Sequence, residues 1–238
     1  LAKSPQAKLL EQVFGGKYAN RLLGTSECSH RRESTEPFSS ISVDIKHKST
    51  LQDSLKSFCE GEVLSGENKF QCSHCAKPVD TLKRCLIHSL PGILAIHLKR
   101  FEFDYVQMRH YKLNSSCSFP VELDMEPYMR ESHAAKESAK AKANGDQGEG
   151  EDRPTESSND ESAETLADLI NLAQARKAAG YYDYELVGVV VHVGSSDAGH
   201  YYSFIKERPD SLPPGRVRDA TVGTKWFEFN DSYVTEFD

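Results

Sequence analysis

The chain is 238 residues long, which is enough for one or two domains with a sizeable core. Its formal net charge of −7 argues against a nucleic-acid-binding protein, because such a protein needs a basic face to neutralise phosphates. No apolar stretch approaches the ~18 residues of a membrane-spanning helix. We therefore expect no nucleic-acid partner and no membrane partner.

Six cysteines occur at irregular spacings, apart from one Cys-x-x-Cys. A disulfide framework would be unusual in a chain of this length, so a reduced compartment is favoured, and we expect the cytoplasm, the nucleus or both. The sequence begins at Leu1 without a methionine, which favours an excerpt from a longer protein.

The N-terminal third predicts two helices and a strand. An apolar stripe predicts a helix over residues 1–14, which Gly15-Gly16 ends. Alternation over Phe38–Ile45 predicts a strand. Residues Thr50–Phe58 are expected to form a short helix with Thr50 as its N-cap.

A tight turn rich in potential metal ligands is expected at Phe70–Pro78. After it, Thr81–Ser89 alternates weakly, and Ile93–Phe103 begins as a buried strand and continues as an alternating one.

Residues 131–165 contain no Val, Ile, Leu, Met or aromatic residue. Such a segment buries too little apolar surface to offset the entropy of ordering, so we predict that it is disordered. It is either a linker between two domains or an acidic insertion within one. Residues Ser162–Ala179 are expected to form a helix that Gly180 ends.

The C-terminal part predicts three strands in series, which suggests an antiparallel sheet. They are Tyr184–Val193, His200–Lys206 and Lys225–Phe229.

A histidine and an asparagine stand at the ends of two of these strands. His200 opens one strand, and Asn230-Asp231 ends another, so adjacent antiparallel strands would bring them together. A histidine takes a proton from a thiol near neutral pH when a third group, Asn or Asp, holds its ring in one tautomer. The alternative is an ordinary surface histidine beside a turn.

A second group of residues has the types that bind zinc. Cys72 and Cys75 have the spacing of a zinc knuckle, and tetrahedral zinc needs four ligands. Cys28 and His30 are the best candidates for the other pair, with His74 as an alternative fourth ligand. A redox disulfide is the rival interpretation. The other three cysteines read as buried small hydrophobes, namely Cys59, Cys85 and Cys117.

Three segments together resemble the ubiquitin-specific protease family of deubiquitinating cysteine proteases, and FGG (14–16) and LDMEPY (123–128) resemble its large multidomain members in particular. LPGILAIHLKRF (90–101) is similar to that family's palm strand, and YELVGVVVHVGSSDAGHYYSF (184–204) to its histidine box. WFEFNDSYV (226–234) is similar to the box that supplies the third catalytic group. The resemblance covers everything except the acidic stretch, in the same order along the chain.

The resemblance implies an α+β fold, the fingers and palm of a hand with the thumb largely absent. It implies an antiparallel sheet with zinc-ribbon-like fingers and flanking helices. Fingers are expected at about 17–90 and palm at about 91–130 and 180–238, with 131–165 as the disordered acidic insertion. Ubiquitin and ubiquitinated proteins are the implied partners.

The same resemblance implies roles for single residues. His200 matches the family's general base and Asn230 the residue that orients it, while Asp231 is a neighbour that could share this role. Cys72 and Cys75 match one zinc pair of the fingers, and Cys28 one member of the other. Where the family commonly has the fourth ligand the chain has Thr25, so structural zinc requires His30 as the substitute.

The family's cysteine box has no match in this chain. We therefore expect a fragment of a thiol-dependent hydrolase that cleaves isopeptide or peptide bonds at the C-terminal glycine of ubiquitin, inactive by itself. The alternatives are a ubiquitin-binding pseudoenzyme and a zinc-ribbon interaction module.

Overall fold

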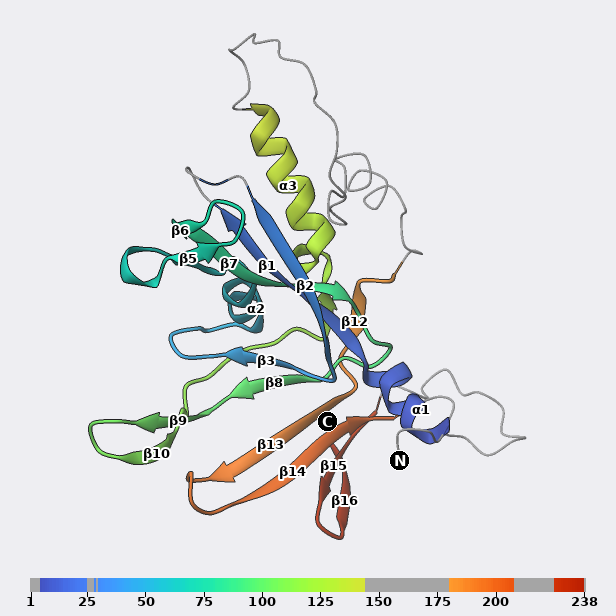
Figure 1. Ribbon diagram of the computed structural model, residues 1–238. Coiled ribbons are helices and arrows are strands. Elements are labelled where there is room, and N and C mark those ends of the chain that lie inside the picture. Colours follow the sequence, from blue (N-terminus) through green and yellow to red (C-terminus); the bar gives the residue numbers. More distant parts are fainter. Residues whose placement is uncertain (1–4, 25–27, 29, 144–179, 208–224, 238) are drawn as a thin grey trace. The chain divides into compact units, whose positions relative to one another are not determined.

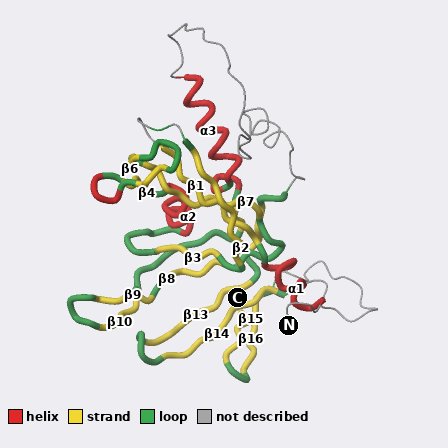
Figure 2. Tube along the Cα trace, in the orientation of Figure 1, coloured by secondary structure: helices red, strands yellow, loops and turns green. Residues whose placement is uncertain are grey.

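The computed structural model of the chain describes residues 5–24, 28, 30–143, 180–207 and 225–237 (Figure 1). The chain forms two compact units, and each is assembled from three separate stretches of sequence. Unit 1 comprises Leu1–Ser42, Leu55–His97 and Asp124–Asp183, and unit 2 comprises Val43–Ser54, Leu98–Leu123 and Tyr184–Asp238. Strands prevail over helices in the described residues (Figure 2), and both four-stranded sheets are antiparallel. The predicted α+β class is confirmed.

Unit 1 is built on a four-stranded sheet with the order β2-β1-β7-β4. Its centre pairs Ala19 with Leu86, and both side chains are fully buried. The weakly alternating segment Thr81–Ser89 forms strand β7 over its whole length. The bounds are β1 Gly16–Gly24, β2 Arg31–Phe38, β4 Glu62–Leu64 and β7 Thr81–Ser89.

Helix α1 (Pro5–Phe14) confirms the predicted N-terminal helix within the described residues. Gly15 N donates to Glu11 O at its end, and β1 starts at Gly16. The predicted strand Phe38–Ile45 is wrong in its bounds, because Phe38 ends β2 and a bend separates it from β3 (Ile41–Asp44).

Helix α2 (Leu51–Glu60) begins as the sequence predicts. The Oγ1 atom of Thr50 accepts a hydrogen bond from Asp53 N at 3.0 Å, and its hydroxyl donates to the Asp53 carboxylate at 2.7 Å. One helix N–H group is thereby satisfied by the cap, which stabilises the first turn. The apolar face buries Leu55 completely and Cys59 almost completely.

Helix α3 (Arg130–Ala143) overturns the prediction of disorder for residues 131–143. Its segment is rich in Ala, Lys and Glu, which are strong helix formers, so the helix needs few apolar side chains. Residues 144–165 and the predicted helix Ser162–Ala179 lie outside the described residues.

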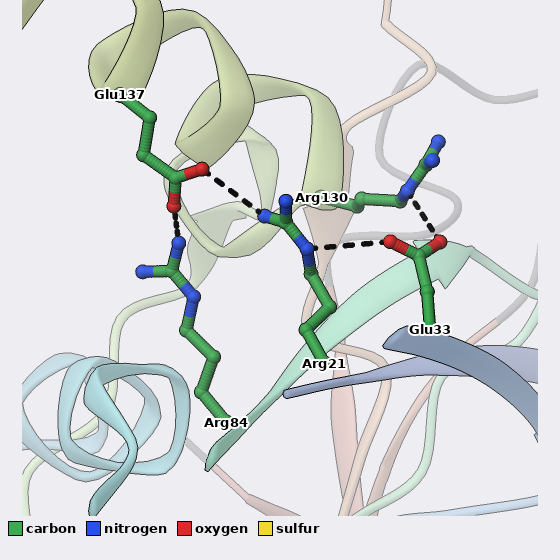
Figure 3. Close-up of polar contacts among 5 residues, drawn as sticks. All are labelled: Arg21, Glu33, Arg84, Arg130 and Glu137. Atoms are coloured by element: carbon green, nitrogen blue, oxygen red, sulfur yellow. Dashed lines mark hydrogen bonds and ion pairs between the residues drawn. The ribbon is translucent and has the colours of Figure 1, made fainter. Parts of the chain in front are cut away.

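Ion pairs anchor α3 to the sheet of unit 1 (Figure 3). Glu137 bonds Arg84 of β7 and lies 3.4 Å from Nη1 of Arg21 in β1. Glu33 of β2 lies 3.3 Å from Nε of Arg21 and 2.6 Å from Nε of Arg130. All three arginine side chains are at most 10% exposed. Charge pairing therefore takes the place of the apolar stripe whose absence suggested disorder.

Unit 2 contains an antiparallel sheet with the order β13-β14-β15-β16. The predicted long strand from Tyr184 is interrupted, because Leu186 N donates to Val121 O and leaves the line of the sheet. The strand β16 was not predicted. The bounds are β13 Gly188–Gly194, β14 Gly199–Lys206, β15 Trp226–Asn230 and β16 Tyr233–Phe237.

The remaining elements are short. The predicted strand Ile93–Phe103 is divided at Arg100, whose guanidinium donates to the carbonyls of Leu113 and Ser115. Strand β3 pairs with β8, β9 with β10, β11 with β12 and β5 with β6. Their bounds are β5 Phe70–Cys72, β6 Lys77–Val79, β8 Ile96–Lys99, β9 Phe101–Asp104, β10 Arg109–Lys112, β11 Glu122–Asp124, β12 Asp183–Glu185, and the 3-10 turns η1 Gly66–Asn68 and η2 Glu126–Tyr128.

Among the described residues, no helix is both long enough and apolar enough to cross a membrane. The assignment of fingers and palm to residues 17–90, 91–130 and 180–238 stays a prediction.

Candidate active site and candidate metal centre

The pairing of β14 with β15 brings His200 and Asn230 together in unit 2. The strands are antiparallel, with Ser203 opposite Phe229, so the start of β14 lies beside the end of β15 (Figure 1). Nε2 of His200 lies 2.6 Å from Oδ1 of Asn230. The juxtaposition predicted from the strand pattern is therefore present.

This contact determines which ring nitrogen of His200 carries the hydrogen. The carbonyl oxygen of Asn230 only accepts, so Nε2 of His200 must carry the hydrogen and Nδ1 retains its lone pair. Among the described residues, no hydrogen bond to Nδ1 is found. The His200 side chain is 46% exposed, so a proton donor can approach it.

The asparagine is held by a residue that the sequence analysis missed. Its Nδ2 donates to Oε1 of Glu228 at 3.3 Å, which turns Oδ1 toward His200. Glu228 and Asn230 are two positions apart in β15, so their side chains lie on the same face of the sheet. This spacing is visible in the sequence, but it is the same as in any strand with alternating polar residues.

Asp231 occupies a different place from Asn230. Its Oδ2 lies 4.0 Å from Nε2 of His200, too far for a hydrogen bond, and its side chain is 80% exposed. Its backbone is left-handed, with φ of +52°, in the turn between β15 and β16. Asp231 thus adds negative charge near the ring without orienting it.

The turn that precedes His200 is tied down from β10. Lys112 Nζ donates to the carbonyls of His192 at 2.7 Å and Gly194 at 3.3 Å, and Ser196 Oγ donates to His110 O at 3.0 Å. The ring of His192 lies so close to Gly199 that a Cβ there would meet its Nε2 at 2.1 Å. Glycine is therefore required beside His200 for steric reasons.

The candidate metal ligands converge in unit 1. Cys28 and His30 come from the connection of β1 to β2, and Cys72 and Cys75 from the turn of the β5–β6 hairpin. The four ligand atoms all lie within 4.8 Å of one another. His74 is not in this group, and its ring stacks on that of His30 with centroids 4.6 Å apart.

The spacing of these atoms fits a tetrahedral metal. Bonds of ~2.3 Å to sulfur and ~2.0 Å to nitrogen give ligand–ligand edges of about 3.8 Å for two sulfurs and about 3.5 Å for sulfur and nitrogen. The sulfur of Cys28 lies 3.7 Å from that of Cys72 and 3.6 Å from that of Cys75. Nδ1 of His30 lies 3.3–3.8 Å from the three sulfurs. A disulfide needs ~2.05 Å, so these cysteines are not bridged.

The local backbone favours the thiolate that a metal requires. A hydrogen bond from the backbone of Cys75 lowers the pKa of Cys72, and a second one from the backbone of His74 adds to this effect. The Cys28 sulfur, followed by desolvation, raises the pKa of Cys75 to about 11. Three sulfurs this close cannot all be thiolates without a cation between them, so the donor set fits a metal ion.

The other three cysteines are not activated thiols. Burial raises the pKa of Cys59 to about 12, of Cys85 to about 11 and of Cys117 above its ordinary value. Cys59 and Cys117 are buried, as predicted, and Cys85 is half-buried.

Known proteins resemble the chain in both sequence and fold. The sequence model of the family "Ubiquitin carboxyl-terminal hydrolase" matches residues 2–238. The chain is 36% identical over 230 residues to "Ubiquitin carboxyl-terminal hydrolase 9X" of Mus musculus, covering 96% of this chain and 8% of that protein. It is 35% identical over 231 residues to "Probable ubiquitin carboxyl-terminal hydrolase FAF" of Drosophila melanogaster, covering 97% and 7%. The chain thus spans 7–8% of the length of these relatives.

A solved structure shares the fold. It is a SAGA DUB module, composed of a Ubp8 variant with Sgf11, Sus1 and Sgf73 and bound to monoubiquitin. The match has a TM-score of 0.65 and 25% identity, covering 100% of this chain and 40% of that one. The family match extends over nearly the whole sequence and agrees with this fold. The chain therefore belongs to the ubiquitin carboxyl-terminal hydrolase family, among the ubiquitin-specific proteases that its motifs resemble.

Proposed function

We propose that this chain is part of a thiol-dependent deubiquitinase that hydrolyses the isopeptide or peptide bond after the C-terminal glycine of ubiquitin. The observation that carries the proposal is the 2.6 Å contact between His200 and Asn230 in a member of this family. The relatives named above are hydrolases of the ubiquitin C-terminus, and one structural neighbour is bound to monoubiquitin, which supports ubiquitin and ubiquitinated proteins as partners.

His200 is the general base in this proposal. With Nε2–H donated to Asn230, Nδ1 takes the proton from a thiol, and the thiolate attacks the carbonyl carbon of the ubiquitin glycine. The protonated ring then gives this proton to the departing amine, which leaves an acyl-enzyme. In the second half, Nδ1 accepts a proton from a water molecule as its oxygen attacks the acyl carbon. The carbon–sulfur bond then breaks, the thiolate leaves and takes this proton back from Nδ1, and ubiquitin is released with a free carboxylate. Asn230 holds the ring throughout, and Asp231 stabilises the imidazolium charge from 4.0 Å.

The attacking thiol comes from a part of the protein not included in these 238 residues. The cysteines outside the metal cluster have raised pKa values, which disfavours the nucleophilic thiolate. The remaining three face one another and His30. The chain by itself is accordingly expected to be inactive.

Zinc is the ion we propose for the cluster of Cys28, His30, Cys72 and Cys75. The three sulfurs and one nitrogen form a closed set of four, which is typical of structural sites and leaves no position for a reacting water. Bound zinc would supply a cross-link between two loops. Cys28, Cys72 and Cys75 pack with the buried side chain of Val79, so this cross-link would lie beside Val79.

A non-catalytic ubiquitin-binding protein is the second candidate. The cysteines outside the metal cluster have raised pKa values, and this candidate, unlike the first, needs no nucleophilic thiol. It predicts that the whole protein binds ubiquitin and does not cleave it.

The decisive experiment uses the whole protein that contains this chain and a fluorogenic ubiquitin C-terminal amide. We expect His200→Ala to lower kcat by about 10³-fold or more, because a positioned base is lost. His110→Ala, an exposed histidine of the same unit, is the matched control and should retain activity. Unchanged turnover in His200→Ala would reject the assignment, and no turnover in the unaltered protein would favour the binding protein.

A further inference from the structure

The amide of Asn230 has two chemically opposite sides, and its rotation decides what His200 meets. In the structure the carbonyl oxygen faces Nε2 of His200 at 2.6 Å, and the NH2 group faces Glu228 at 3.3 Å. The carbonyl side only accepts and the NH2 side only donates. The observed orientation therefore requires hydrogen on Nε2 and leaves Nδ1 as the basic atom.

A half-turn of the amide would reverse this outcome. The NH2 group would then face Nε2 and favour the tautomer with hydrogen on Nδ1, which cannot take a proton from a thiol. The two ends of an asparagine amide have nearly the same shape, so steric fit alone does not choose between the orientations. Hydrogen bonding to the far side of the amide has to make the choice.

Glu228 is positioned to select the observed orientation of the Asn230 amide. It precedes Asn230 by two positions in β15, so both side chains lie on the same face of the sheet. It is partly buried, and an ionised carboxylate accepts hydrogen bonds but donates none. Glu228 can thus pair with the NH2 side and repels the carbonyl side. Asp231 does not compete, because its Oδ2 is 4.0 Å from the ring nitrogen and outside hydrogen-bond range of it.

We propose that Glu228 is a positioning residue that fixes the amide of Asn230 and, through it, the proton-accepting nitrogen of His200. The inference rests on the proposed role of His200 as base. A consequence follows for a carboxylate in place of the Asn230 amide. A carboxylate presents oxygen in either orientation, so Asn230→Asp removes the choice and makes Glu228 dispensable.

The first test measures the His200 tautomer directly, by ¹⁵N NMR of the imidazole in the 238-residue chain. Glu228→Gln can accept or donate and so no longer favours one side of the Asn230 amide, and it should shift a smaller fraction to the Nδ1–H tautomer than Glu228→Leu, which should shift a large fraction. The matched control is Glu236→Leu, on the opposite face of the same sheet, which should change nothing. An unchanged tautomer in Glu228→Leu would overturn the proposal.

The second test is a double-mutant comparison of turnover in the whole protein. Glu228→Leu should lower kcat roughly 10- to 100-fold with little change in KM, since a hydrogen bond to a charged group is lost. In the Asn230→Asp background the same substitution should cost nothing. An equal loss in both backgrounds would show a merely structural role and overturn the proposal. The NMR result does not depend on turnover, so failure of His200 as the base is recognised separately.

Discussion

Two histidines, His30 in unit 1 and His200 in unit 2, show how surroundings decide what one side chain does. His30 lies with three sulfurs within 4.8 Å, in a closed set beside buried Cys28 and Cys72. His200 is 46% exposed, with one nitrogen bonded to an amide and the other open. A closed donor set suits a structural ion, and an open nitrogen suits proton transfer. The comparison predicts that the two sites fail in different ways.

The largest expected effect is loss of the metal cluster. Cys75→Ser, or removal of the metal by a chelator, should lower the free energy of unfolding of unit 1 by several kcal/mol. Structural zinc supplies ~10–16 kcal/mol in zinc-finger peptides. Hydrogen exchange should report lost protection in β1, β5 and β6. The control is Cys117→Ser in unit 2, and metal content should stay at one ion there. Full metal binding by Cys75→Ser would contradict the ligand assignment.

The second largest effect is expected from loss of the buried ion pairs of α3. Glu137→Gln removes the carboxylate that pairs with Arg84 and one of the two that pair with Arg21, which should lower the free energy of unfolding by about 3 kcal/mol. Denaturant unfolding measures this loss. The exposed i,i+4 pair Lys56–Glu60 is the control, since Glu60→Gln should cost less than about 0.5 kcal/mol. Equal effects would mean that charge pairing does not anchor α3.

A smaller effect is expected at the cap of α2. Thr50→Ala removes the acceptor for Asp53 N and should cost about 1 kcal/mol, whereas Thr50→Ser should retain most of it. Thermal unfolding of the three proteins measures the difference. If Ser and Ala are equally destabilising, the hydroxyl is not the cap.

The smallest effect concerns pH. Burial, and then Arg84 and Lys136, lower the pKa of His133 in unit 1. The folded chain therefore binds this proton less well than the unfolded chain, so its contribution is full above about pH 6.5 and is lost as the pH falls below it. His133→Gln should make stability less dependent on pH between 7 and 5. An unchanged pH dependence of stability in His133→Gln would contradict the assignment.

The two sites also differ in how far the sequence predicted them. The strand ends allowed a meeting of His200 and Asn230 but left an ordinary surface histidine as an alternative, and the resemblance to the family favoured the meeting that the structure has. Glu228 could not be found, because strand alternation places a polar residue at every second position whatever its role. The four metal ligands were named, but only the structure excluded His74, whose ring stacks on that of His30.

Helix α3 was missed for a different physical reason. Its segment was judged by apolar content, whereas the structure anchors it through Glu137 and Arg130 to arginine and glutamate residues on β1, β2 and β7 (Figure 3). Such pairing joins residues more than a hundred positions apart, as between Arg21 and Glu137. No local pattern records it.

One experiment tests the division of roles most directly: zinc content and ubiquitin-amide turnover measured together in His200→Ala of the whole protein. The account predicts the same zinc content as in the unaltered protein and turnover lowered by about 10³-fold or more. Retained turnover in His200→Ala would contradict the account, because His200 would then not be the base.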